Sequence, residues 1–257
     1  MRFTLRPLMR HVSRLSITLA AVLALSAILH VWSYFFTRRL FERYQETLLD
    51  PAGLAEYPNT PPPAAEQRLR VVFFGDSRAA MWPAPTLPPE ANYEFINRGI
   101  GSQTTAQMLL RFDAQVSPLH PDVVVLQAGM NDLRTVGLLP AERQAIIAHC
   151  SEHLHDLIAH ANQAGAKVIV TTIFGFNEVP LTWVPFWSDE IPRAIDEVNR
   201  DLRQLKGPDV TVLDAAKILA DPHDATRVAT PYRLGMDHLN AAGYSKLNEA
   251  LERLLIH

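Results

Sequence analysis

Two widely separated polar segments of the sequence contain the residues needed for nucleophilic catalysis by a serine. Ser77 closes the apolar run VVFFGDS, and His238 stands in the segment GMDHLNAAGY near the C-terminus. A serine hydroxyl is unreactive near neutral pH unless a base such as imidazole accepts its proton during attack. The pair therefore predicts acyl transfer through a covalent intermediate. The simpler alternative is that Asp76 and Ser77 only cap a helix, as these residue types commonly do.

Two further segments supply hydrogen-bond donors for the negative charge that such an attack creates. The segment NRGIGSQTT, residues 97–105, has glycines that permit close backbone approach, and its N–H groups can point towards a substrate. The segment GMND contains Asn131, whose side-chain amide donates without titrating. Fixed donors of this kind are worth about 3–4 kcal/mol each where their removal has been measured in other enzymes. A nucleophile, a base and two donors thus stand in four segments.

The elements between these segments predict a sheet that brings them together. Short apolar runs rich in β-branched residues occur at 70–75, 93–98, 122–129, 166–173 and 209–214, and helical patterns occur at about 103–115, 140–164, 189–206 and 239–255. Strands this apolar are covered on both faces, so we expect a five-stranded parallel sheet in a three-layer α/β/α sandwich. Ligands of such sheets bind beyond the carboxyl ends of the strands, which is where the first three polar segments begin.

Taken together, the four segments resemble the SGNH, or GDSL-like, hydrolase family. The resemblance rests on the GDS turn, the NRGIG loop, the GMND loop and the HLNAAGY segment, in the family's order and rough spacing over residues 70 to about 250. It implies a flavodoxin-like fold, with Ser77 as nucleophile and His238 as base. It also implies an oxyanion hole from the Ser77 backbone N–H, the second loop and the Asn131 side chain. Neither a metal nor an organic cofactor is implied.

Two positions depart from the family pattern. The family loop usually reads G-I-G-G, whereas Ser102 follows Gly101 here, so the backbone of either residue is a candidate for the second donor. The aspartate usually found three residues before the histidine is replaced by Gly235. The imidazole is then oriented either by Asp237, from a reshaped loop, or by a backbone carbonyl, which leaves a Ser–His dyad. Asp214 is another acid at this edge, although a strand-terminal aspartate more often caps a turn.

The first 36 residues predict a membrane anchor. A basic leader, residues 1–14, carries four arginines and precedes an apolar stretch, residues 15–36, with no formally charged side chain. The 22 residues of this stretch span about 33 Å as a helix, close to the thickness of a bilayer core. We expect a single transmembrane helix with a cytoplasmic N-terminus and an exported catalytic domain, periplasmic in a bacterium. The alternatives are a cleaved signal peptide and a helix buried in the core.

Residues 37–69 are expected to form a juxtamembrane stalk. They include the segment YPNTPPPAAEQ, whose prolines favour an extended polyproline conformation over helix or central strand. The hydrolase domain is accordingly assigned to residues 70–257.

Composition excludes several classes of partner. With 24 basic and 27 acidic side chains, the chain has a formal net charge of -3 and no overall field that would attract nucleic acid. Its one cysteine, Cys150, excludes an internal disulfide and a cysteine-cluster metal site. The expected partners are a small-molecule or glycan-linked ester and a membrane, with no nucleic acid and no metal.

Three other features have both a functional and a simpler interpretation. His149 and His153 are four residues apart, a spacing found in some zinc sites, but without a third ligand a solvated helix face is expected. The segment FGFNEVPLTWVPFWSDE carries aromatic residues that either line an acyl or ring-binding pocket or pack on the core. Arg78 is expected at the surface, the alternative being a contact with an anionic substrate group.

The sequence therefore predicts a membrane-anchored serine esterase that hydrolyses carboxylic esters, acetyl esters included. One alternative is an O-acyltransferase or a carbohydrate deacetylase of the cell envelope, because all of these share the first half-reaction. Another is a weakly active module that binds an acylated polymer. This alternative is considered because Ser102 and Gly235 depart from the family pattern.

Overall fold

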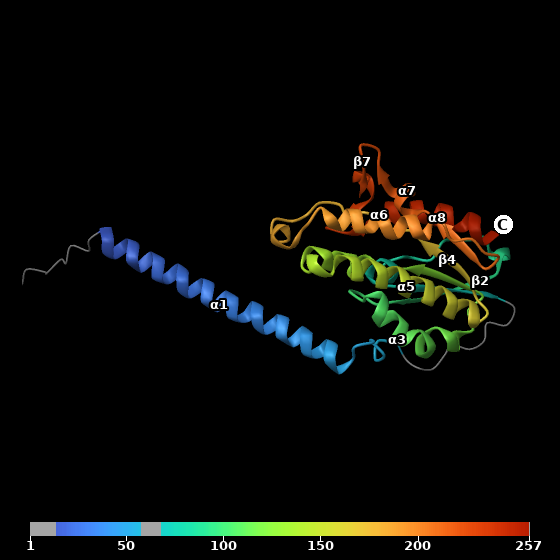
Figure 1. Ribbon diagram of the computed structural model, residues 1–257, viewed down its shortest axis with the longest axis horizontal. Coiled ribbons are helices and arrows are strands. Elements are labelled where there is room, and N and C mark those ends of the chain that lie inside the picture. Colours follow the sequence, from blue (N-terminus) through green and yellow to red (C-terminus); the bar gives the residue numbers. More distant parts are fainter. Residues whose placement is uncertain (1–13, 58–67, 257) are drawn as a thin grey trace, which may run out of the picture. The chain divides into compact units, whose positions relative to one another are not determined.

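A five-stranded parallel sheet forms the core of the α/β unit in the computed structural model, which describes residues 14–57 and 68–256 (Figure 1). The strands are β1 (Leu69–Gly75), β2 (Tyr93–Gly99), β3 (Val123–Gln127), β4 (Lys167–Thr171) and β5 (Val210–Leu213). Their order is β2-β1-β3-β4-β5, the flavodoxin-like order, so chain direction across the sheet reverses next to β1. The five expected strands are confirmed, with boundaries that move by one or two residues at most ends.

Both faces of the sheet are covered by helices, because alternate residues of each strand point to opposite faces. On β1, Val72 and Phe74 pack with one face of the core and Val71 and Phe73 with the other, and all four are buried. The first face is covered by α3 (Thr105–Gln115), α5 (Arg143–Gln163) and α6 (Glu190–Leu202), and the second by α7 (Ala215–Leu219) and α8 (Ala241–Ile256). The predicted α/β/α sandwich is therefore confirmed.

Several short elements lie outside the sequence-based prediction. They are α2 (Ser77–Ala80), α4 (Met130–Arg134) and the small strands β6 (Ala220–Asp221), β7 (Asp224–Val228), β8 (Arg233–Leu234) and β9 (His238–Leu239). Elements of two to five residues are too short to show a helical or strand period in the sequence. Three of them, α2, α4 and β9, begin at or beside residues expected to do chemistry.

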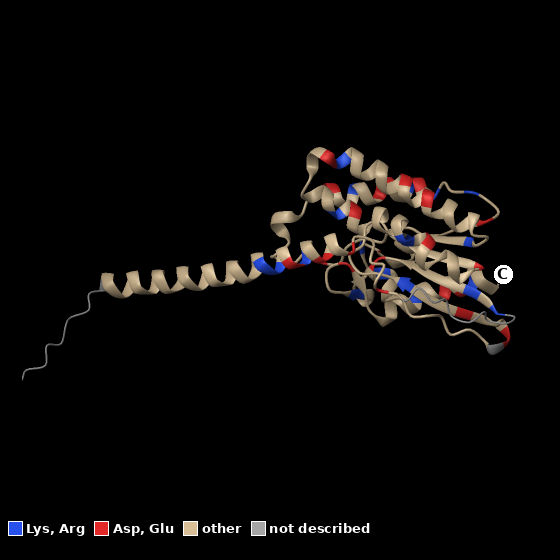
Figure 2. Cartoon of the chain, turned by 90° about the horizontal axis from the view of Figure 1, so that it is seen from below, with Lys and Arg blue, Asp and Glu red and all other residues tan. Residues whose placement is uncertain are grey.

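The N-terminal helix α1 (Arg14–Leu49) belongs to a separate compact unit, Met1–Pro51. Its apolar side chains are exposed, as at Trp32 and Phe35, and Figure 2 shows a long stretch of it without charged residues. This helix is long and apolar enough to cross a membrane, a test that a signal sequence also passes. A helix buried in the core is excluded for the described part of the chain, because none of the apolar window of α1 is buried.

The second compact unit begins at Ala52, which is earlier than the predicted start of the hydrolase domain at residue 70. Ala52 is buried, and its carbonyl accepts a hydrogen bond from Nε2 of Gln103 at 2.7 Å. Residues 52–57 thus pack against the α/β unit. Most of the proline-rich part of the expected stalk, and nearly all of the basic leader, lie outside the described residues, so these domain assignments stay predictions.

Candidate active site

Ser77 stands at the first turn after β1, where the chain passes directly from strand to helix. Gly75 is required there, since a Cβ atom would lie 2.0 Å from the carbonyl oxygen of Gln127. The side chain of Asp76 caps α2 by accepting a hydrogen bond from the Arg78 backbone N–H at 2.8 Å. Capping is therefore the role of Asp76, which leaves the hydroxyl of Ser77 available at the carboxyl end of the sheet.

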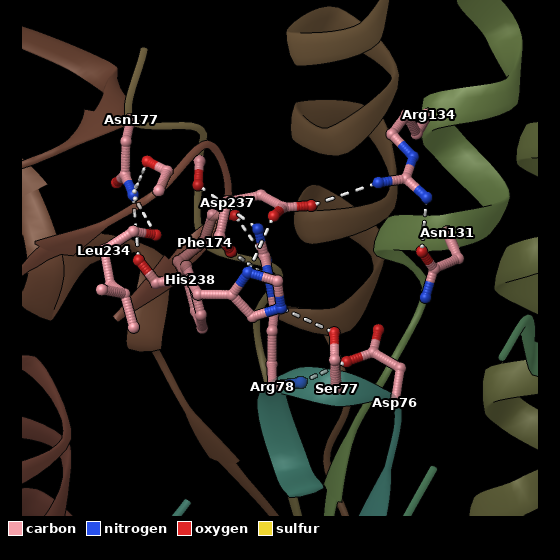
Figure 3. Close-up of polar contacts among 12 residues, drawn as sticks. Asp76, Ser77, Arg78, Asn131, Arg134, Phe174, Asn177, Leu234, Asp237 and His238 are labelled. Carbon is pink, nitrogen blue, oxygen red and sulfur yellow. Dashed lines mark hydrogen bonds and ion pairs between the residues drawn. The ribbon is translucent and has the colours of Figure 1, made fainter. Parts of the chain in front are cut away.

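His238 lies next to Ser77 although 161 positions separate them in the chain. Its Nε2 is 2.9 Å from Ser77 Oγ, and its Nδ1 is 3.0 Å from Oδ1 of Asp237 (Figure 3). These contacts link a hydroxyl, an imidazole and a carboxylate in one line. A chain of this kind can pass the hydroxyl proton to the ring while the carboxylate holds the ring's other nitrogen.

A tight hairpin allows Asp237 to contact the imidazole of His238, although the two residues are neighbours in the chain. Strands β8 and β9 pair antiparallel with Leu234 opposite His238, so only three residues form the turn. Gly235 enters this turn at a φ of 57°, in the left-handed region that favours glycine, and a Cβ atom added there would meet no other atom within 4 Å. The hairpin thereby supplies the reshaped loop through which Asp237 comes within reach of the imidazole.

Asn177 holds this hairpin from the loop after β4. Its Nδ2 is 2.9 Å from the carbonyl oxygens of both Gly235 and His238 and 3.1 Å from that of Leu234. The side chain is 2% exposed, so these contacts are shielded from water. Asn177 is not among the residues predicted from the sequence, where the only signal was an asparagine in the loop following a predicted strand.

Arg78 is buried beneath the site, which contradicts the expectation of a surface arginine. Its guanidinium donates to the carbonyl oxygens of Asp237 at 2.9 Å and Phe174 at 2.7 Å, and its Cζ lies 3.8 Å from the centroid of the Phe174 ring. Burial lowers the pKa of Arg78. Arg78 does not face solvent, so it cannot meet a substrate anion, and instead it joins the hairpin to the loop after β4.

The carboxyl group of Asp237 is favoured in its charged form. Burial alone would raise its pKa, but the hydrogen bond from His238 and the positive charges of Arg78 and Arg134 together lower that pKa below its ordinary value. A carboxylate in this position can stabilise an imidazolium.

Asp76 behaves in the opposite way. Burial raises its pKa to about 6, against which the charge and the backbone N–H of Arg78 act only in part. One of its oxygens, Oδ2, has no hydrogen-bond partner among the described residues.

The expected oxyanion donors lie on the other side of Ser77. A Cβ atom on Gly101 would lie 3.9 Å from Cβ of Ser77, and Ser102 beside it adopts a left-handed φ of 65°. Asn131, the second residue of α4, donates through Nδ2 to the carbonyl oxygen of Gln103 at 2.9 Å. A side-chain amide has two N–H groups, so one remains for a substrate oxygen. We call residues 99–103 the oxyanion loop.

Arg134 connects the two sides of the site. Its guanidinium donates to Oδ1 of Asn131 at 3.0 Å and to Oδ2 of Asp237 at 3.4 Å (Figure 3). Because the amide oxygen faces the guanidinium, the amide nitrogen must face the oxyanion loop. Arg134 also lies 5.0 Å from the ring centroid of Trp183, which brings the aromatic segment to the site. Arg134 is not among the residues predicted from the sequence. Its position three residues after Asn131, about one helical turn away, was the signal that could have placed it at the site.

The aromatic residues of the segment FGFNEVPLTWVPFWSDE were expected either to line a pocket or to pack on the core, and they do not all behave alike. Trp187 packs on Phe176, with ring centroids 4.7 Å apart, and so contributes to the core. Trp183 and Phe186 pack on each other, and Phe186 is 46% exposed.

Other candidate residues have partners elsewhere. Asp214 caps α7 and bonds Thr172 and Arg203. His149 stacks on His153 with ring centroids 6.1 Å apart. Within residues 14–57 and 68–256, no group of three or more His, Cys, Asp or Glu side chains could hold a metal ion.

Comparison with known proteins identifies relatives of this fold. The profile of the GDSL-like lipase/acylhydrolase family matches residues 54–246. A GDSL-like lipase from Bacteroides thetaiotaomicron is similar at 22% identity and a TM-score of 0.60, over 83% of this chain and 97% of that one. A variant of an acetyl xylan esterase from Geobacillus stearothermophilus is similar at 18% identity and a TM-score of 0.54, over 73% of this chain and 94% of that one. No curated protein matches the chain.

Proposed function

Because the chain belongs to the GDSL-like lipase/acylhydrolase family and is a hydrolase of ester bonds, we propose that it cleaves carboxylic esters through an acyl-enzyme on Ser77. The observation that carries this proposal is the pair of contacts made by His238, at 2.9 Å to Ser77 and at 3.0 Å to Asp237. The first distance lies within the range for proton transfer between a nucleophile and its base, and the second within the range for the hydrogen bond that orients the base.

In the first half-reaction, Nε2 of His238 accepts the hydroxyl proton of Ser77 while Oγ attacks the ester carbonyl carbon. The carbonyl oxygen becomes an oxyanion, which accepts hydrogen bonds from the backbone of Ser77, from the oxyanion loop at Gly101 or Ser102, and from the free N–H of Asn131. The carbon–oxygen bond to the alcohol then breaks, and the imidazolium gives its proton to the departing oxygen.

The second half-reaction releases the acid. Water attacks the acyl-enzyme, His238 accepts a proton from this water, and the second oxyanion is stabilised by the same donors. When the bond to Oγ breaks, the proton returns to Ser77. In both halves the carboxylate of Asp237 holds the Nδ1–H of the ring, which fixes the tautomer and stabilises the imidazolium.

The test uses the full chain with p-nitrophenyl acetate and a fluorophosphonate probe. We expect turnover, labelling of the peptide that contains Ser77, and loss of both in His238→Ala. The control is His120→Ala, because His120 is an exposed histidine outside the site. If the wild type shows neither turnover nor labelling, the esterase proposal is wrong and the binding-module alternative is favoured.

A carbohydrate ester is the second candidate substrate, and Trp183 is the observation that favours it. This half-buried ring lies beside Arg134, which contacts both Asn131 and Asp237, and aromatic rings of this kind can stack on a sugar. The acetyl xylan esterase with a similar fold supports the same class. Release of acetate from acetylated xylooligosaccharides would indicate a deacetylase, whereas acylated sugar formed from p-nitrophenyl acetate and a glycan acceptor would indicate an O-acyltransferase.

We also propose that residues 15–36 anchor the chain in a membrane, with the leader 1–14 in the cytoplasm and the hydrolase domain outside it. The length and apolar composition of α1 support an anchor or a signal sequence equally. An intact N-terminus in the membrane fraction, detected by mass spectrometry, would favour the anchor, and a mature N-terminus within or after this helix would favour cleavage.

A further inference from the structure

The oxyanion loop is attached to a chain segment that precedes the whole α/β sheet in sequence. We call residues 52–57, which directly follow the unit containing α1, the docking segment. Gly53 in this segment has a φ of 70°, and a Cβ atom there would lie 2.9 Å from Nε2 of Gln103 and 3.0 Å from Cδ1 of Ile100. The docking segment therefore packs closely on two residues of the loop.

Gln103 joins the docking segment to the oxyanion donor Asn131. Its side chain is 4% exposed, with Nε2 donating to the carbonyl of Ala52 at 2.7 Å and Oε1 accepting from Arg111. Its own carbonyl oxygen accepts the hydrogen bond from Nδ2 of Asn131 at 2.9 Å. A shift of the docking segment would move Gln103, and with it the acceptor that orients the Asn131 amide.

Further contacts hold the start of the loop. The hydroxyl of Tyr57 donates to the carbonyl of Gly99 at 2.6 Å, and the guanidinium of Arg98 lies 4.6 Å from the Tyr57 ring centroid. Nε2 of Gln115 donates to the carbonyl of Gly53 at 2.9 Å. The docking segment thus touches both ends of residues 99–103.

The conformation of Ser102, a candidate oxyanion donor, depends on how the loop is held. A non-glycine residue in the left-handed region is strained, and it persists only when its surroundings hold it there. The core fixes the loop at Ile100, whose N–H donates to the Gly75 carbonyl at 3.0 Å, and beyond it at Thr105, whose N–H lies 3.0 Å from the Asp132 carboxylate. Between these points, the docking segment contacts Gln103, the residue next to Ser102.

We propose that residues 52–57 are a positioning segment for the oxyanion hole, so that the chain entering the catalytic unit from α1 helps to set its activity. This inference rests on the proposed esterase function. None of these residues touches Ser77 or His238 through the contacts described above, so the segment acts through Gln103 and the loop.

The test compares two glycine-to-alanine variants of the full chain. Gly53→Ala places a methyl group against Gln103. Gly165→Ala imposes a similar backbone cost, because Gly165 has a φ of 86°, but its Cβ would meet no atom within 4 Å. We expect Gly53→Ala to lower kcat for p-nitrophenyl acetate by about tenfold with KM within about twofold, and Gly165→Ala to leave both nearly unchanged. Equal kcat values in the two variants would overturn the proposal.

A second readout separates this proposal from the esterase proposal. Hydrogen–deuterium exchange of the peptide spanning residues 98–104 should be faster in Gly53→Ala than in Gly165→Ala, whether or not the wild type turns over an ester. No difference in exchange would overturn the positioning role alone. If Gly53→Ala does not fold, Tyr57→Phe removes only the hydroxyl bound to Gly99, and it should lower kcat by about threefold and speed exchange of the same peptide.

Discussion

The two sides of the proposed active site are held in different ways. The proton-transfer side consists of Ser77, Asp237 and His238. Ser77 lies on α2, and the other two residues lie on the β8–β9 hairpin, which has a three-residue turn. Buried side chains donate to several backbone carbonyls of this hairpin, so its shape is fixed many times over.

The oxyanion side consists of Gly101, Ser102 and Asn131, and its loop is held partly by the docking segment, which lies outside the α/β sheet. Its loop contains a strained residue, and its amide donor is oriented by two partners, Gln103 and Arg134. Substitutions on the proton-transfer side should therefore stop the chemistry while leaving the geometry intact, whereas substitutions on the oxyanion side should change geometry and rate together.

After the loss of activity expected for His238→Ala, Asp237→Asn should have the largest effect on rate. An amide at this position cannot accept the Nδ1–H and stabilise an imidazolium in the same way, and the corresponding change in a serine protease lowers kcat by about 10⁴. We expect a loss of about 10³–10⁴ in kcat for p-nitrophenyl acetate. Asp214→Asn is the matched control, because Asp214 bonds Thr172 and Arg203 instead of the imidazole. A similar loss in both variants would contradict the assignment of Asp237.

Asn131→Ala should come next. Removal of one oxyanion donor lowers kcat by about 10²–10³ in enzymes of this chemistry, with KM much less affected. Steady-state kinetics with p-nitrophenyl acetate provide the measurement. A change confined to KM would mean that Asn131 binds the ground state and not the oxyanion.

Asp76→Asn tests the cap of α2, the helix that carries Ser77, through stability instead of rate. The folded-state pKa of Asp76 is about 6, above the ordinary 3.8, so the folded protein retains a proton that the unfolded chain loses. The stability linked to this proton is fully present below pH 4 and is lost as pH rises to about 6, on the order of 3 kcal/mol in total.

Asparagine at position 76 keeps the cap without the charge, so it avoids this loss. The free energy of unfolding of the variant minus that of the wild type, measured with denaturant, should rise between pH 4.5 and pH 7.5. A difference that is constant with pH, or that falls, would show that Asp76 is not buried as an unfavourable charge.

Ser102→Gly should have the smallest effect. Glycine relieves the left-handed strain, and it also adds backbone entropy to the unfolded chain, which acts in the opposite direction. The strain is the larger effect, so the free energy of unfolding should increase by about 1 kcal/mol. His120→Gly is the control, because His120 has a φ of 49° and lies outside the site. Both variants should gain stability and only Ser102→Gly should alter kcat, whereas a loss of stability in Ser102→Gly would contradict the strain at this position.

The sequence predicts the sheet well because its strands are apolar on both faces, as Val71 to Phe74 illustrate. Parallel strands end at one edge, which explains why Ser77 and the two donor loops converge, whereas the place of His238 beside Ser77 was expected from the order of the four segments and the family that they resemble. The contact between Asp237 and the imidazole of His238 could not be predicted, because it depends on a hairpin whose strands are only two residues long. The burial of Arg78 was missed for a similar reason: its carbonyl partners lie 96 and 159 positions away.

The connection between α1 and the docking segment is short. Only Asp50 and Pro51 separate the last residue of α1 from buried Ala52, and the three Cα-to-Cα steps from Leu49 to Ala52 extend at most about 11 Å. An α1 held in a membrane, as proposed above, would therefore tether the hydrolase directly to that membrane and favour esters presented at its surface.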